Sequence, residues 1–166
     1  ETYLLEKSRI TSHEADERTY HIFYQLLDAP DEVKATIWSG LKDSDASSFK
    51  YVGHGSGIMI EGRTDAQAWQ RTSDALATIG IEDAKLVTLM KAITIVMQLG
   101  NLSFGPDPSN DENSVITSTH ELKKLAELMG VSLDVVKGAL TFRTVVAGKE
   151  VYKVPLNVTD AQDNCD

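Results

Sequence analysis

The sequence contains one cysteine and four histidines, and both scarcities restrict its chemistry. Cys165 has no partner for an internal disulfide, so we expect a protein of a reducing compartment. Serine and cysteine nucleophile motifs are absent, and the carboxylates follow no recognisable catalytic pattern. The histidines lack the paired spacing of metal ligands; they are His13, His21, His54 and His120. The sequence therefore predicts neither a catalytic centre nor a metal site.

Positive charge is also scarce, with 16 lysines and arginines against 25 acids and a net charge of −9. This balance argues against a nucleic-acid partner, because phosphate binding requires a basic surface. No signal-peptide or anchor pattern is present, and 25% of the residues are charged. We therefore expect a cytoplasmic protein with no membrane span. The length of 166 residues and 42% hydrophobic content predict a single domain, residues 1–166, with its own core.

One glycine-rich run, Gly53 to Gly57, invites interpretation as a phosphate-binding loop. A phosphate loop would continue into a Gly-Lys-Ser/Thr ending and the start of a helix, and neither follows here. We therefore interpret the run as a flexible turn.

The stretch from Glu82 to Leu99 is the most apolar part of the chain. Its apolar residues recur at helical spacing and then widen until little polar face remains. Two lysines within it and acids beside it favour a core helix over a membrane span. A helix this apolar is not expected on a surface, so we predict a central buried helix that ends at Gly100-Asn101.

Helical patterns dominate the remaining sequence, so we predict a mainly α, multi-helix fold. Three capping boxes, each a Ser or Thr followed three residues later by Glu or Gln, begin at Thr11, Thr64 and Ser118. The predicted helices run from Thr11 to Leu27, Asp31 to Gly40, Thr64 to Ile79, Ser118 to Met129, Ser132 to Leu140 and from Asn157 onward.

Three further local expectations complete this prediction. The helix that begins at Thr64 should pack against the central helix as an antiparallel pair. Residues 105–113 are rich in Pro, Asn and Asp and predict a surface loop. Thr2 to Leu5 is apolar and β-prone, so we predict one N-terminal strand there.

Residues 142–155 alternate imperfectly around Ala147-Gly148-Lys149 and predict a hairpin or an extended protruding loop. Three basic residues and one acid leave this stretch with two net positive charges inside an acidic chain; they are Arg143, Lys149, Lys153 and Glu150. A basic, apolar projection is a candidate for docking an acidic partner. An ordinary solvated hairpin explains the composition equally well.

Three stretches of this sequence resemble the myosin motor domain, in the order and spacing of that family. They are LLEKSR from Leu4, ERTYHIFYQLL from Glu17 and LGNLSF from Leu99. FKYVGHGSG and ALTFRTVVAGKEVYKVPLN, from Phe49 and Ala139, also fit. The resemblance covers the whole chain.

This resemblance implies that the chain is most of the upper fifty-kilodalton subdomain of an unconventional myosin. The strand at Thr2 to Leu5 would be an edge of the transducer, and residues 142–155 would be the cardiomyopathy loop. Its expected actin contacts are Arg143, Lys149, Glu150, Tyr152 and Lys153. In this family one position of the loop is acidic or phosphorylatable, and it lies sixteen residues before a particular aspartate. Asp166 matches that aspartate, so the corresponding loop residue here is Glu150. The match near Asp166 is partial, because Cys165 stands where arginine is usual.

The resemblance also implies partners and cofactors. The parent motor would bind ATP and Mg and move on an actin filament in the cytoplasm, associated with the cytoskeleton. The family's phosphate loop and switch residues match no part of this sequence, so we expect no cofactor here and no ATPase activity from this chain alone. Its partners would be actin and the rest of the motor domain, whose actin-binding cleft it would help to wall. The alternative is a free-standing helical adaptor whose aromatic helix presents a groove to another protein.

Overall fold

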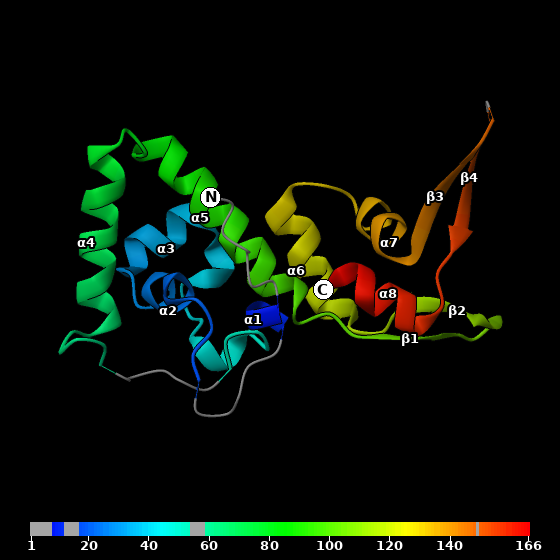
Figure 1. The fold of residues 1–166 in the computed structure, drawn as a ribbon, viewed down its shortest axis with the longest axis horizontal. Helices are drawn as coiled ribbons and strands as arrows, with labels where there is room; N and C mark the ends of the chain where they lie inside the picture. The colour runs from blue at the N-terminus through cyan, green and yellow to red at the C-terminus, as the bar shows by residue number, and fades with distance from the viewer. Residues whose placement is uncertain (1–7, 12–16, 54–58, 149) are drawn as a thin grey trace, which may run out of the picture. The chain divides into compact units, whose positions relative to one another are not determined.

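The computed structural model describes residues 8–11, 17–53, 59–148 and 150–166 (Figure 1). The predicted strand from Thr2 to Leu5 and most of the glycine-rich run lie outside these residues, so both stay predictions. Within the described residues the chain forms eight α-helices and two antiparallel two-stranded sheets, which confirms the mainly α fold. It divides into two compact units, Glu1–Met97 and Gln98–Asp166, and each is described by itself. The assignment of both to one domain stays a prediction.

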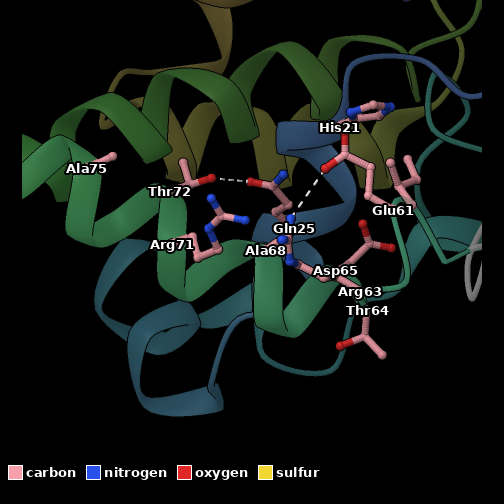
Figure 2. Close-up of a pocket in the computed structure, with 11 residues that line it drawn as sticks. His21, Gln25, Glu61, Arg63, Thr64, Asp65, Ala68, Arg71, Thr72 and Ala75 are labelled. Atoms are coloured by element: carbon pink, nitrogen blue, oxygen red, sulfur yellow. Dashed lines mark hydrogen bonds and ion pairs between the residues drawn. The ribbon is translucent and has the colours of Figure 1, made fainter.

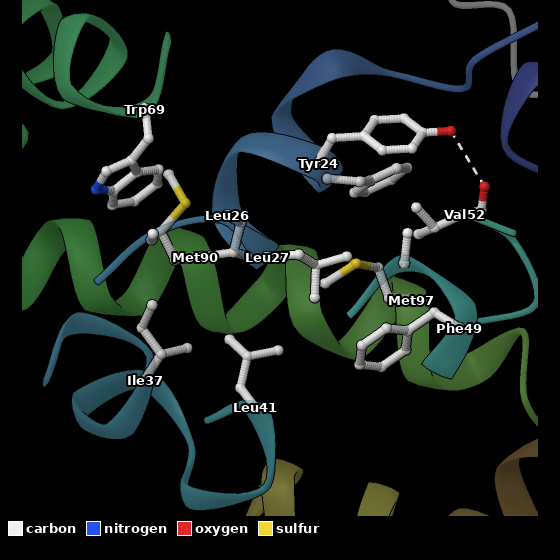
Figure 3. Close-up of a cluster of buried hydrophobic side chains, with 13 residues drawn as sticks. Tyr24, Leu26, Leu27, Ile37, Leu41, Phe49, Val52, Trp69, Met90 and Met97 are labelled. Carbon is white, nitrogen blue, oxygen red and sulfur yellow. Dashed lines mark hydrogen bonds between the residues drawn. The ribbon is translucent and has the colours of Figure 1, made fainter. Parts of the chain in front are cut away.

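The first unit contains four helices and most of a fifth. They are α1 (Ser8–Thr11), α2 (His21–Leu27), α3 (Asp31–Ile37), α4 (Asp65–Thr78) and α5 (Asp83–Leu99). Short 3-10 turns at Ser39–Leu41 and Ala46–Ser48 follow α3. Buried side chains from these elements form one core cluster (Figure 3) that includes Tyr24, Leu26, Phe49, Trp69, Met90 and Met97.

The predicted helix from Thr11 to Leu27 is wrong over residues 17–20, which are not helical. Tyr20 is extended, with φ −61° and ψ 132°, and α2 begins only at His21. The Thr19 hydroxyl donates a hydrogen bond to the Arg9 carbonyl oxygen at 2.9 Å, and Arg18 is buried beside it in the chain. These long-range contacts use the polar side chains of the segment and outweigh its local helical preference.

Helix α4 begins as the sequence predicts. The Thr64 hydroxyl accepts a hydrogen bond from the Gln67 amide at 3.3 Å, and the Gln67 side chain accepts one from the Thr64 amide at 3.1 Å, so the capping box is complete. The predicted antiparallel pair of α4 with α5 is wrong, because α4 packs chiefly on α2. Gly80, with φ +78°, follows α4, and the two helices diverge from this turn (Figure 1).

Helix α5 has nearly the predicted bounds, but only part of its surface is covered by described residues. Met90, Thr94, Met97 and Gln98 are buried. Leu89 is 37% exposed, so the expectation of a helix buried on most sides is wrong within the described structure. The reason is that its apolar residues surround the axis, whereas the core cluster of this unit packs on one side.

The second unit begins with a hairpin where the sequence predicted a surface loop. Strand β1 (Phe104–Asp107) pairs with β2 (Asn110–Ile116) in antiparallel register. The Asp107 carboxylate accepts hydrogen bonds from the amide and hydroxyl of Ser109 at 2.8 and 2.6 Å and so shapes the turn. The polar composition therefore marks a tight turn and exposed strand residues rather than an irregular loop.

Three helices and a second hairpin complete this unit: α6 (Thr119–Met129), α7 (Leu133–Thr141), β3 (Phe142–Ala147), β4 (Glu150–Pro155) and α8 (Val158–Cys165). Ser132 and Asn157 cap α7 and α8 through their side-chain oxygens, as predicted. The predicted capping box at Ser118 does not form, because the Ser118 hydroxyl accepts a hydrogen bond from the Ser103 amide at 2.9 Å instead. Glu121, the other half of that box, binds Gln98.

Candidate functional site

The β3–β4 hairpin is the candidate functional site. Its strands pair in regular antiparallel register from Phe142 opposite Pro155 to Ala147 opposite Glu150. Gly148 follows β3 with φ +64°, a conformation typical of the tight turns that join such strands. This confirms the hairpin that the sequence predicted between residues 142 and 155.

The base of the hairpin is tied into its unit by backbone hydrogen bonds. The Leu156 amide donates to the Thr141 carbonyl at 2.8 Å, and the Ser114 amide donates to the Leu156 carbonyl at 2.9 Å. Thr141 and Leu156 are both buried. Beyond them every described hairpin residue except Val154 is exposed, and the ribbon extends away from α7 (Figure 1). The hairpin is therefore a firmly rooted projection with two open faces.

The register distributes the side chains between these two faces, because residues directly opposite each other share a face and the faces alternate along each strand. We name the faces after two neighbouring residues of β4. The Tyr152 face carries Arg143, Val145, Ala147, Glu150, Tyr152 and Val154. The Val151 face carries Phe142, Thr144, Val146, Val151, Lys153 and Pro155.

The residues that we predicted as one actin-contacting site are therefore divided between the two faces of the hairpin. Arg143, Glu150 and Tyr152 share a face, and the Tyr152 hydroxyl donates a hydrogen bond to the Glu150 carboxylate. Lys153 lies on the opposite face, and Lys149 lies outside the described residues. Sequence reasoning missed two valines, Val146 and Val151, which are 68% and 66% exposed. Strict strand alternation about Gly148 was the signal that could have identified them.

A hollow of about 390 Å³ lies in the first unit between α2 and α4 (Figure 2). The Thr72 hydroxyl donates to the Gln25 side-chain oxygen at 2.7 Å across it. Arg63 pairs with Glu61 at its rim at 3.3 Å. Other lining residues are His21, Ile60, Thr64, Asp65, Ala68, Arg71 and Ala75. The hollow can admit a small polar group. Among its described lining residues the Thr72 and Thr64 hydroxyls bind Gln25 and the Gln67 amide rather than a general base, so the hollow defines no reaction.

Beside this hollow, Arg18 donates a hydrogen bond to Asp65 at 2.7 Å, and the two side chains are 6% and 8% exposed. The charges of Arg18 and Asp65 also act on the carboxyl group of Asp28. Burial raises the pKa of Asp28, the charge of Asp65 raises it further, and Lys34 and Arg18 oppose this rise. The sequence contained no signal for this pair, because its members are 47 residues apart.

The described residues contain no group of three or more His, Cys, Asp and Glu side chains placed to hold a metal ion. Among the same residues, no helix is both long enough and apolar enough to cross a membrane.

The described residues thus form a mainly helical fold with an exposed, rooted hairpin. Comparison with known protein families places the chain in a class of motor proteins. The chain belongs to the myosin head (motor domain) family, which matches residues 1–166. This agrees with the resemblance read from the three sequence stretches.

The particular relatives are unconventional myosins. The chain is 35% identical over 159 residues to unconventional myosin-Ic of Danio rerio, covering 96% of this chain and 15% of that protein. It is 33% identical over 162 residues to unconventional myosin-Ib of Homo sapiens, covering 96% and 14%. It is 32% identical over 151 residues to unconventional myosin-Vb of Mus musculus, covering 91% and 8%. The chain therefore spans a small part of the length of each.

Proposed function

We propose that this chain is part of the upper fifty-kilodalton subdomain of an actin-based, ATP-driven motor. The β3–β4 hairpin is its cardiomyopathy loop and contacts the actin filament. The observation that carries this proposal is the hairpin itself, a basic ribbon on an acidic chain of the myosin head family, rooted at Thr141 and Leu156 and exposed on both faces.

In this proposal the chain supplies actin contacts and one wall of the actin-binding cleft, and other parts of the motor bind ATP and Mg. The motor acts in the cytoplasm in association with the cytoskeleton. The chain alone hydrolyses no ATP. The myosin head family matches this chain from residue 1 to residue 166, and this membership favours the motor function over that of a free-standing adaptor.

The test uses the complete motor that carries this sequence, with residues 143–154 replaced by a short Gly-Ser linker. Actin-activated ATPase activity should fall sharply, and basal ATPase activity should stay close to the unmodified value, because the nucleotide site lies elsewhere. Arg71→Ala on the exposed surface of α4 is the control for a lost surface charge. Full actin activation without the hairpin would reject its role in actin contact.

A further inference from the structure

Val146 and Val151 form the most exposed apolar pair of the described chain. They lie directly opposite each other in the hairpin register, and they are 68% and 66% exposed. Among the described large hydrophobic residues only Ile79 is more exposed. Two β-branched side chains held side by side in water form a preorganised apolar contact, because each has few rotamers to lose on binding.

The fold of the described residues covers neither valine. The sheet contains only β3 and β4, and no described element forms a layer over either face. Exposed apolar surface of this kind on a rooted projection is typical of a contact with another molecule.

The charges of the two faces differ in a way that identifies the partner's chemistry. Among the described residues of the Val151 face Lys153 is the single charged one, and Thr144 lies opposite it in the register. On the Tyr152 face the charges of Arg143 and Glu150 balance. An acidic partner surface is therefore attracted to the Val151 face more strongly than to the Tyr152 face.

We propose that the hairpin docks on the actin filament through its Val151 face. Val146 and Val151 fill an apolar recess, and Lys153 lies beside a carboxylate at its rim. The Tyr152 hydroxyl holds the Glu150 carboxylate on the opposite face, so Glu150 acts by shaping the hairpin and makes no contact with the docked surface. This inference rests on the proposed function of the hairpin and adds which face engages the filament.

The test compares two pairs of isosteric substitutions in the complete motor. Val146→Thr/Val151→Thr alters the Val151 face, and Val145→Thr/Val154→Thr alters the Tyr152 face of the same two strands, where Val145 is 38% exposed and Val154 is half-buried. Threonine keeps the β-branched shape and the strand preference of valine. Because the first pair places hydroxyl groups in an apolar recess, its dissociation constant for actin should rise about tenfold or more. The second pair should change the constant less than about twofold.

Salt separates the apolar contact from the charge contact. Cosedimentation with actin should show the loss in the Val146/Val151 variant at low and at high salt. The loss caused by Lys153→Ala should shrink at high salt, because ions screen the exposed charge. Equal losses from both valine pairs, or a larger loss from the Val145/Val154 pair, would overturn the assignment of the face.

The outcomes also separate this inference from the function on which it rests. If the linker replacement weakens actin binding and the Val146/Val151 variant does not, the hairpin contacts actin through other groups and only the face assignment fails. If the linker replacement has no effect, the proposed function of the hairpin fails as well.

Discussion

Arg18 and Asp65 form a buried ion pair with 2.7 Å between their nearest charged atoms. The Arg18 guanidinium also lies 3.7 Å from the centre of the Tyr24 ring, a cation–π contact in the core. The pair joins the segment before α2 to the first residue of α4. It therefore connects the two helices that pack most closely in the first unit.

Removal of one partner of this pair should destabilise the chain strongly. Arg18→Met or Asp65→Asn leaves the other charge buried, at a cost of about 3–5 kcal/mol in the free energy of unfolding. Urea denaturation should show this, and the double variant should lose less than the sum of the single losses. The exposed pair of Arg63 with Glu61 is the control, and Arg63→Met should cost less than about 1 kcal/mol. Similar costs at both sites would contradict the buried role of Arg18.

Met90 and Leu89 are neighbours on α5 with opposite environments. Met90 is 1% exposed and lies in the core cluster, so Met90→Ala should leave a cavity and cost about 2–5 kcal/mol. Leu89 is 37% exposed, and Leu89→Ala should cost less than about 1 kcal/mol. Thermal and urea unfolding of both variants measure the difference. Equal losses would contradict the one-sided burial of α5.

Acid should weaken the second unit through Glu121. Burial alone would raise the pKa of this carboxyl, but hydrogen bonds from Gln98 and Lys124 outweigh burial and lower the pKa from its ordinary 4.5. A lowered folded-state pKa contributes stability that is fully present above pH 4.5 and is lost as the pH falls through the folded-state pKa.

The measurement is the urea midpoint at neutral pH and at several values below pH 4.5. Glu121→Gln should lower stability at neutral pH and flatten its fall in acid, because the titrating carboxyl is gone. Glu112→Gln, on the exposed end of β2, is the matched control for the loss of one carboxylate. A profile that is equally steep with and without Glu121 would refute this contribution.

Glu150 and Tyr152 should act as a unit in the complete motor, since one hydrogen bond joins them. Glu150→Ala should lower actin-activated ATPase activity at low salt and leave basal activity nearly intact. Tyr152→Phe, which removes the hydroxyl, should reproduce much of this effect, and the double variant should add little. Glu150→Ser should resemble Glu150→Ala until it is phosphorylated, because a phosphate restores the negative charge. Additive losses from the two single variants would show that the residues act separately.

Local patterns in the sequence predicted much of the secondary structure. Helical spacing placed α5 within a residue of its observed bounds, and short-range caps placed the starts of α4, α7 and α8. The hairpin at residues 142–155 followed from alternation about Gly148. These features depend on residues within four positions of each other, so the sequence displays them directly.

Two local predictions failed where a distant contact outweighed the local pattern. Residues 17–20 left the predicted helix because Arg18 binds Asp65, 47 positions away. Ser118 satisfied the Ser103 amide, and Glu121 bound Gln98 in place of the predicted capping box. No periodicity encodes such pairings, because they arise only when separate segments pack together.

For the candidate site, too, some features follow from the sequence and others only from the tertiary structure. By itself the sequence determined that residues 142–155 are a basic segment, a hairpin or an extended loop, in a chain of the myosin head family, since composition, alternation and family motifs all lie along the chain. Only the tertiary structure decided that Val146 of β3 lies directly opposite Val151 of β4, and that the Tyr152 hydroxyl binds the Glu150 carboxylate. The physical reason is register. A shift of one residue in the pairing would move the side chains of β4 to the other face relative to those of β3, and the backbone hydrogen bonds between Thr141, Leu156 and Ser114 at the base of the hairpin hold the pairing in place.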